Sequence, residues 1–261
     1  MLNTTILDQK TFDVTFSKIA KAEQAYDQAL IEAIHAWENE FGSDRVSFQV
    51  DAYQKNTIAS HRSIPAVVKL LDANEISIAI KIAQKFNVKV YPISTGNNWG
   101  YGSALPVTEN CVIFDLKGMN KIVDFDAELG TVTLEPGVTQ QMLYDYLQST
   151  NANYLVPVTG AGPDCSILGN ALERGYGITP HTDHFAAVNC ITAVLPNGDI
   201  YRSNFTEVNA EQIDKIHKWG LGPYLDGIFT QSNMGIVTQI TIDLKKKPEC
   251  IEFFTFKINS D

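Results

Sequence analysis

The chain has 261 residues, which is enough for one large domain or two smaller ones and far more than a disulfide-stapled miniprotein needs. Hydrophobic residues make up 44% of it, and its 17 glycines and 10 prolines are ordinary for a globular protein, so disorder and fibrous repeats are excluded. The formal net charge is -10 without a dense basic cluster, which excludes extended nucleic acid as a partner.

Cysteine spacing and the N-terminus bear on location. The four cysteines form no C-x-x-C pair, so neither a zinc site nor a disulfide framework is predicted. Asp8, Lys10 and Asp13 stand where a secretory signal would need an apolar run, so we expect a cytoplasmic protein. The longest uncharged stretch, 91–108, is broken by prolines and glycines and cannot form a membrane helix, so we expect no membrane partner.

The first elements in chain order predict a helix and then a small α/β layer. Apolar residues at helical spacing over 17–41, with Gly42 as C-cap, predict an N-terminal helical segment within residues 1–55. Residues 64–70 suit a short strand, and the apolar spacing that follows predicts a helix starting after Asn74. Further strands are expected over 88–93 and 111–116. This order predicts partly parallel pairing.

The second half predicts antiparallel strands with helices. Residues 122–125 and 131–135 suit a hairpin, and Thr139 suits the N-cap of a helix. Asp164 is predicted to cap another helix that ends near Gly175. Pro196-Asn197-Gly198 lies between residues 189–195 and 199–202, which predicts a hairpin turn that joins two strands. Alternating apolar residues over 236–242 predict a half-buried strand, so this half reads as an antiparallel α+β layer.

The end of the chain allows two interpretations. Lys245-Lys246-Lys247-Pro248 interrupts the pattern, and residues 251–258 then form a new apolar run with strand character. One interpretation is a solvated linker with an edge strand. The other is that a second domain begins here, so that residues 248–261 are its start.

One glycine-rich loop, Pro92 to Gly102, predicts an anion site. Its glycines and its adjacent asparagines, which tolerate positive φ, allow successive backbone N–H groups to turn inward and form an anion-binding nest. Because no Lys or Arg occurs between Lys89 and Lys117, amide and hydroxyl dipoles would have to hold the anion. No Gly-Lys-Ser/Thr follows and the glycines do not open a helix, so Walker and Rossmann loops are excluded.

A second glycine-rich segment, 158–177, strengthens that interpretation. Gly169, Asn170 and Ala171 give a predicted helix a narrow face that either a flat ring or another helix could approach. Its end leads into a polar cluster over 173–184. Within it, His181 and His184 have H-x-x-H spacing, but no third metal ligand is evident, so we expect no metal.

Five stretches carry a family resemblance. PISTGNNWGYG, GNALERGYGITP, the Asp183-His184 pair, VLPNGD and GPYLDGIFTQSNMGIVT resemble the FAD-binding domain of the vanillyl-alcohol oxidase and p-cresol methylhydroxylase family over residues 56–247. The resemblance implies an α+β, two-subdomain PCMH-type fold that binds FAD between its layers. It also implies a substrate-binding cap domain, which would lie beyond Asp261 and is largely absent here. Thr182 departs from the family, whose members usually have Gly before Asp-His.

The resemblance implies specific site residues. The first loop would cradle the diphosphate, the 157–177 segment would line the ribityl chain and ring, and the strand near 235 would pass close to the cofactor. His61 falls where some relatives have a histidine that assists flavin attachment. The expected cofactor-binding residues are Ser94, Thr95, Gly96, Asn97, Asn98, Gly100, Tyr101, Gly102, Ser103, Pro157, Gly160, Gly162, Ile167, Gly169, Asn170, Gly175, Gly177, Gly235, Ile236, Val237 and His61.

The expected activity is hydride transfer from a small-molecule substrate, a phenolic alcohol, alkylphenol or 2-hydroxy acid, to the flavin. The resemblance puts a carboxylate at Glu173 near flavin N5, with Asp183 and His184 as further proton-handling candidates. The alternative is a flavin-binding module that needs a cap-bearing partner chain. Homo-oligomerisation is a further expectation, because an absent cap would leave apolar surface exposed.

Overall fold

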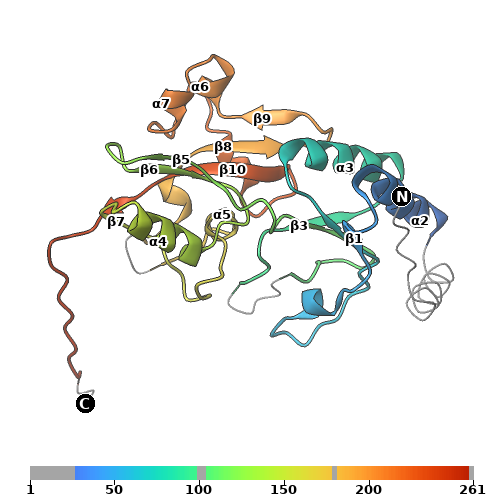
Figure 1. Cartoon of the computed structure of the whole chain (residues 1–261), viewed down its shortest axis with the longest axis horizontal. Coiled ribbons are helices and arrows are strands. Elements are labelled where there is room, and N and C mark those ends of the chain that lie inside the picture. Colours follow the sequence, from blue (N-terminus) through green and yellow to red (C-terminus); the bar gives the residue numbers. More distant parts are fainter. Residues whose placement is uncertain (1–26, 99–103, 178–180, 259–261) are drawn as a thin grey trace, which may run out of the picture.

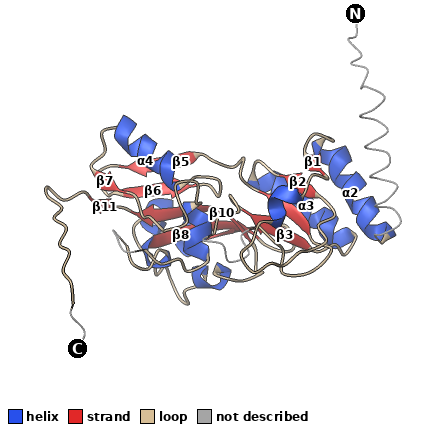
Figure 2. Cartoon of the chain, turned by 90° about the horizontal axis from the view of Figure 1, so that it is seen from below, coloured by secondary structure: helices blue, strands red, loops and turns tan. Residues whose placement is uncertain are grey.

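The computed structural model describes residues 27–98, 104–177 and 181–258. Two α+β layers lie side by side, as Figures 1 and 2 show. The first contains a four-stranded sheet of order β1-β2-β4-β3, and the second a five-stranded sheet of order β5-β6-β10-β8-β9. Across these described ranges, no helix is long and apolar enough to cross a membrane.

The first layer has the predicted partly parallel pairing. β4 (Val112–Asp115) lies between β2 (Val67–Lys69) and β3 (Val90–Ile93) and runs parallel to both, while β1 (Val46–Ser47) is antiparallel to β2. The helix expected after Asn74 is α3 (Ala73–Lys85), and it begins slightly earlier because the Asp72 carboxylate accepts a 2.9 Å hydrogen bond from the Glu75 N–H.

The N-terminal helix belongs to the core of this layer. α2 (Gln28–Phe41) ends at Gly42, whose φ of 95° confirms the predicted C-cap. Its buried Trp37 donates a 3.1 Å hydrogen bond to the Ala79 carbonyl and meets the Phe114 ring edge-on at 5.6 Å. A short 3₁₀ helix, η1 (Asp51–Gln54), follows. The expected helical residues 17–26 lie outside the described part of the chain.

The second layer confirms the predicted antiparallel organisation. Its strands are β5 (Ile122–Asp126), β6 (Thr131–Leu134), β8 (Val188–Val194), β9 (Ile200–Arg202) and β10 (Ile236–Asp243). Thr139 caps α4 (Gln140–Ser149) as expected, by accepting a hydrogen bond from the Met142 N–H. Apolar residues of α4, α5 (Ile167–Leu172) and the sheet form one buried cluster. The remaining short elements are α6 (Asn204–Glu207), α7 (Glu211–Asp214) and the 3₁₀ helices η2 (Phe185–Ala187) and η3 (Asp226–Phe229).

The two layers are held together at the start of β10. Ile236 belongs to the apolar cluster of the first layer, whereas Val237 belongs to that of the second. The turn between β8 and β9 also sits on α3, because the Ser77 hydroxyl donates a 2.6 Å hydrogen bond to the Gly198 carbonyl. Loops from both layers therefore meet at a fixed junction.

Three local predictions were wrong. α5 is capped by Ser166, not Asp164, because the Ser166 hydroxyl accepts a hydrogen bond from the Gly169 N–H, although the helix ends at Leu172, close to the predicted Gly175. The lysine run does not interrupt the strand pattern, since Lys245–Lys246 form β11 and pair with β7 (Tyr154–Leu155). Residues 251–258 form no strand and are exposed, because they have no backbone partner in the described chain.

Candidate functional site

The first glycine-rich loop leaves β3 with unpaired backbone donors. Among the described residues, the N–H groups of Thr95, Gly96 and Asn97 donate no hydrogen bond to the protein. The side-chain oxygen of Thr95 is also buried without a partner. Gly96 has φ of 68°, and a Cβ there would lie 3.0 Å from the Cβ of Ala104. Successive unpaired donors in this conformation suit an anion.

Part of the predicted loop is not described. Gly100, Tyr101, Gly102 and Ser103 lie outside the described residues. Asn98 is described and exposed.

The two glycine-rich segments come together, as the sequence analysis expected of a shared site. A Cβ on Gly169 would lie only 2.5 Å from the Ser94 Oγ, so the absence of a side chain lets the loop reach α5. The Asn97 amide donates a 3.1 Å hydrogen bond to the Asp164 carbonyl. These contacts fix the 94–97 loop of the first layer against the second.

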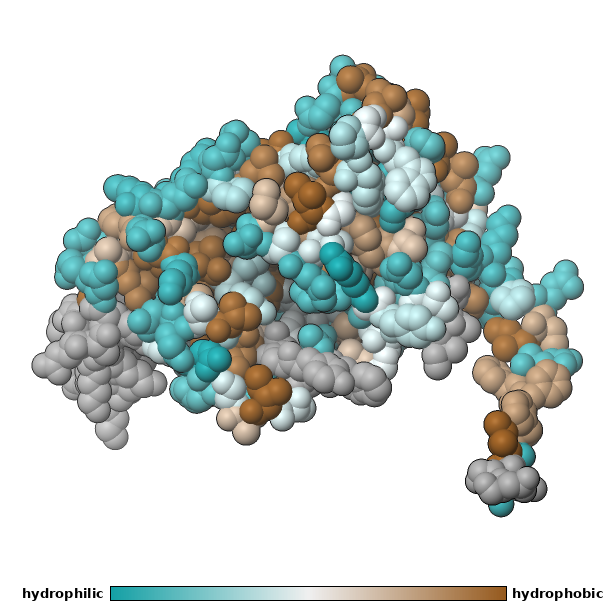
Figure 3. All heavy atoms as spheres, turned by 180° about the vertical axis from the view of Figure 1, so that it is seen from behind, coloured by the Kyte–Doolittle hydropathy of each residue, from teal (hydrophilic) through white to brown (hydrophobic). Residues whose placement is uncertain are grey.

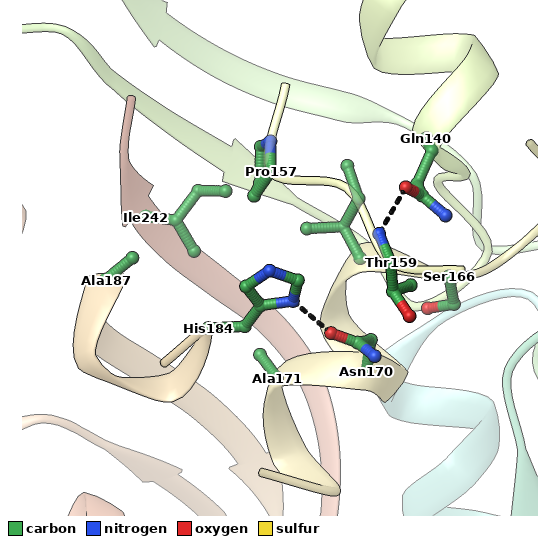
Figure 4. A pocket seen from close by; sticks show the side chains of 10 residues that line it. Gln140, Pro157, Thr159, Ser166, Asn170, Ala171, His184, Ala187 and Ile242 are labelled. Carbon is green, nitrogen blue, oxygen red and sulfur yellow. Dashed lines mark hydrogen bonds between the residues drawn. The ribbon is translucent and has the colours of Figure 1, made fainter. Parts of the chain in front are cut away.

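The side-chain amide of Gln140, a residue that was not predicted to belong to the site, holds the 157–162 segment. The Gln140 amide accepts a 2.9 Å hydrogen bond from the Thr159 N–H and donates a 2.7 Å hydrogen bond to the Gly162 carbonyl. Figure 4 shows Gln140 among the residues that line a small cavity. This cavity has room for about one water molecule. The cavity is lined by Gln140, Pro157, Thr159, Ser166, Ile167, Asn170, Ala171, His184, Ala187 and Ile242.

His184 and Asn170 form a hydrogen-bonded pair that lines the same cavity. The His184 Nδ1 forms a hydrogen bond with the Asn170 Oδ1, and its Nε2 is buried without a partner (Figure 4). Burial, followed by the charge of His181, lowers the pKa of His184, so the imidazole is neutral near pH 7. A neutral ring bonded in this way carries its proton on Nδ1.

Two glycines let this pair form. A Cβ on Gly175 would collide with the Asn170 amide, and one on Gly177 would collide with both the His184 ring and the Val158 carbonyl. The chain pairs with itself here, since the Gly177 N–H donates to the Thr182 carbonyl at 3.0 Å. Gly175 and Gly177 are thus required by packing against Asn170 and His184.

The three candidate catalytic residues lie around this paired segment in different environments. Glu173 is the exposed C-cap of α5, whereas Asp183 is exposed and its carboxylate accepts a 3.1 Å hydrogen bond from the Ala186 N–H. His184 is 5% exposed. Burial, followed by the Glu173 carboxylate, raises the pKa of Tyr91 on β3. The charge of Glu173 therefore acts on a residue of the first layer.

A distant segment of the chain contacts the residues that follow α5. Arg174 donates to the Thr230 hydroxyl, from Nε at 3.2 Å and from Nη2 at 3.1 Å. The Gln231 amide donates a 3.2 Å hydrogen bond to the Glu173 carbonyl. Sequence reasoning missed Thr230 and Gln231, because they lie far along the chain in a segment without a regular pattern.

The remaining predicted residues lie in simpler surroundings. His61 is exposed, while Gly235 packs against the Val194 carbonyl and the Phe229 ring. Ile236 and Val237 point into the two apolar clusters. Pro157 and Ile167 are buried, whereas Gly160 is exposed and Gly162 has φ of 96°.

The H-x-x-H pair has other contacts. The His181 Nε2 lies 3.0 Å from the Asp243 carbonyl oxygen, and burial, followed by the charge of Lys245, lowers the pKa of His181. No group of three or more His, Cys, Asp or Glu side chains suited to a metal occurs in the described ranges.

An amide-lined loop at the junction of an α/β layer and an antiparallel layer defines this chain as a nucleotide-binding domain. The sequence profile described as FAD binding domain matches residues 64–204, more than half of the chain. The chain belongs to this FAD-binding family, and its fold is the predicted PCMH-type fold.

Similar proteins agree with this assignment. The chain is 39% identical over 237 residues to 1'-carboxy-chondrochloren decarboxylase of Chondromyces crocatus, covering 90% of this chain and 44% of that protein. It is 39% identical over 189 residues to the 4-cresol dehydrogenase [hydroxylating] flavoprotein subunit of Pseudomonas putida, covering 72% of this chain and 36% of the subunit. The chain thus spans less than half the length of these relatives.

A solved structure matches over most of the described fold. A p-cresol methylhydroxylase with substrate bound superposes with a TM-score of 0.83 at 35% sequence identity, over 87% of this chain and 45% of that one. The 4-ethylphenol oxidase of Gulosibacter chungangensis superposes with a TM-score of 0.81 at 26% identity, over 86% and 44% of the two chains.

Proposed function

We propose that this chain is the FAD-binding part of a flavin-dependent oxidoreductase that acts on a phenolic alcohol, an alkylphenol or a 2-hydroxy acid. The observation that carries the proposal is the run of unpaired N–H groups at Thr95, Gly96 and Asn97, at the junction of the two layers. These donors and the buried Thr95 oxygen suit a diphosphate, and because no Lys or Arg occurs between Lys89 and Lys117, the amides would hold it without a basic side chain from this stretch.

The residues of this chain have distinct parts in the proposal. The amides of 95–97 bind the diphosphate, and Gly169 lets Ser94 and α5 approach each other so that the cofactor is held between layers. FAD, when bound, supplies the hydride acceptor for the reaction. Glu173 and the exposed Asp183 hold or move a proton, because their carboxylates are accessible.

His184 has a positioning part in this proposal instead of an acid–base one. Its Nδ1 is committed to Asn170 and its ring is almost fully buried, so it has no path to a substrate proton. It holds the 175–184 segment against α5, and through that contact it maintains the turn that carries Glu173.

The substrate class is supported by the names of similar proteins. These include a 4-cresol dehydrogenase, a 4-ethylphenol oxidase and, at 28% identity, a probable D-lactate dehydrogenase of Danio rerio. The relative from Chondromyces crocatus is named a decarboxylase, so an acid substrate that loses its carboxyl group during oxidation is also consistent with the proposal. A cytoplasmic location remains part of the proposal.

A second candidate is a flavin-binding module that requires a cap-bearing chain or a second copy for turnover. The apolar C-terminal tail, residues 251–258, favours this candidate, since the side chains of Phe253, Phe254 and Phe256 are 80–90% exposed. Figure 3 shows the tail extending from the body of the domain with hydrophobic residues along it. Residues 248–261 would then begin the cap, as the sequence analysis expects.

The absorbance spectrum of the purified chain tests both candidates. A yellow protein that bleaches when p-hydroxybenzyl alcohol, p-cresol or D-lactate is added without oxygen supports the oxidoreductase, whereas a yellow protein that stays coloured with all three supports the module. A colourless protein that does not respond to added FAD refutes both. Acid precipitation then separates covalent from non-covalent flavin.

A further inference from the structure

The turn that carries Glu173 is held by a distant segment of the chain. Two hydrogen bonds come from Gln231: its N–H donates to the Leu172 carbonyl at 3.0 Å, and its amide donates to the Glu173 carbonyl at 3.2 Å. A third contact joins Arg174 to the Thr230 hydroxyl, which itself donates a 2.8 Å hydrogen bond to the Gly227 carbonyl. Each of three successive residues of the turn is therefore bonded to 230–231.

Both sides of this contact adopt a strained backbone. Arg174 has φ of 53° and Gln231 has φ of 47°, in the left-handed region that residues other than glycine rarely adopt. Such conformations persist only where the surrounding contacts over-determine them, and they concentrate at functional sites. Here the contacts that determine them are the hydrogen bonds between the two segments.

The consequence for Glu173 is a fixed main chain on both sides of its Cα. Its N–H donates to the Gly169 carbonyl at 3.1 Å, and its carbonyl accepts from Gln231. With both peptide groups held, the direction in which the side chain leaves the turn is also set. The carboxylate is exposed, and its charge reaches Tyr91 across the layer junction.

We propose that Gln231 and Thr230 are positioning residues that direct the Glu173 carboxylate toward the bound flavin. This inference rests on the proposed function, because it takes Glu173 to lie at the cofactor. It differs from a purely structural clamp in one respect. If the contact were only structural, breaking it would change the stability of the protein alone. If it positions Glu173, breaking it would also change the reduction potential of the bound flavin.

The test measures the reduction potential of FAD bound to the full chain, by equilibration with a redox dye and without any substrate. The variants are Gln231→Leu, which removes the amide donor, Gln231→Asn, which keeps a carboxamide and tolerates positive φ, and Gln148→Leu as a control on the exposed face of α4. Each is made in the native chain and in a Glu173→Gln chain.

A carboxylate beside the flavin opposes the negative charge gained on reduction, so its removal or displacement raises the potential. We expect Glu173→Gln to raise the potential and Gln231→Leu to raise it by less. In the Glu173→Gln chain, Gln231→Leu should add no further shift, because the two changes act through one group. Gln231→Asn and Gln148→Leu should leave the potential unchanged, with FAD dissociation constants within about threefold of the native value.

The remaining outcomes overturn the proposal. If Gln231→Leu shifts the potential equally in both chains, or shifts nothing where Glu173→Gln does, Gln231 does not act through Glu173. If Glu173→Gln itself causes no shift, the carboxylate is not at the flavin. A native chain that binds no FAD refutes the proposed function as well. Should Gln231→Leu not fold, Thr230→Val removes the Arg174 acceptor and must give the same direction of shift.

Discussion

Gly177 offers a direct test of how the predicted site is built, through the substitution Gly177→Ala. A Cβ at this position would lie closer than 3.0 Å, the limit that real Cβ atoms respect, to both the Val158 carbonyl oxygen and the His184 Nε2. The backbone of Gly177 is not in the left-handed region, so alanine brings no strain of its own. The substitution therefore measures the steric effect alone.

The expected cost follows from what would have to move. Overpacking a buried site costs about 1–3 kcal/mol. The Val158 carbonyl is backbone, and the His184 ring can retreat only by losing its hydrogen bond to Asn170, worth about 1 kcal/mol. We therefore expect Gly177→Ala to lower the free energy of unfolding by about 2–4 kcal/mol and to weaken FAD binding.

Urea unfolding, followed by circular dichroism with and without FAD, measures this cost. Gly222→Ala is the matched control, because a Cβ there meets nothing within 4 Å and its φ of 76° brings only backbone strain of about 1–2 kcal/mol. The reasoning is refuted if Gly177→Ala is no more destabilising than the control and binds FAD as the native chain does.

Three further predictions concern the loop, the buried imidazole and the N-terminal helix. Asn97→Asp removes the donor to the Asp164 carbonyl and adds a negative charge beside the unpaired amides, so FAD affinity measured by fluorescence titration should fall at least about tenfold, whereas Asn151→Asp at an exposed turn should change little. The pKa of His184 is lowered in the folded state, so its contribution to stability is complete above about pH 6.5 and is lost as the pH falls toward the lowered pKa. Between about pH 7.5 and pH 5, the His184→Gln variant should therefore lose less stability than the native chain, as measured by urea unfolding. An equal loss in both proteins would contradict a buried, neutral His184. Trp37→Ala should cost about 3–5 kcal/mol in thermal or urea unfolding, because it removes a fully buried indole and its hydrogen bond, and a cost below about 1 kcal/mol would show that α2 is not part of the core.

Local chemistry made much of the fold predictable. Gly42 and Thr139 cap helices as their sequence positions indicate, because capping depends on a few neighbouring backbone groups. The turn at Pro196-Asn197-Gly198 joins β8 and β9 for the same reason. The meeting of the two glycine-rich segments also agrees with the expectation that they share a site.

The wrong predictions have tertiary causes. Asp164 and Ser166 are both good helix caps, and Ser166 is used because its buried hydroxyl also donates a 2.6 Å hydrogen bond to the Pro136 carbonyl. The apolar run at 251–258 has strand character but no partner, whereas Lys245 and Lys246 form a strand because β7 lies beside them. The contact of Gln231 with Glu173 could not be predicted from the neighbouring sequence, since the two residues are 58 positions apart.

The contact between Ser77 and Gly198 bears on how the chain is made in the cell. The two residues are 121 positions apart, so α3 leaves the ribosome well before the turn on which it rests has been synthesised. Until then, the side of the nascent first layer that meets this turn is open to chaperones and to other unfinished chains. Synthesis of the first layer alone should yield an aggregation-prone intermediate, and the two layers should unfold as one cooperative unit.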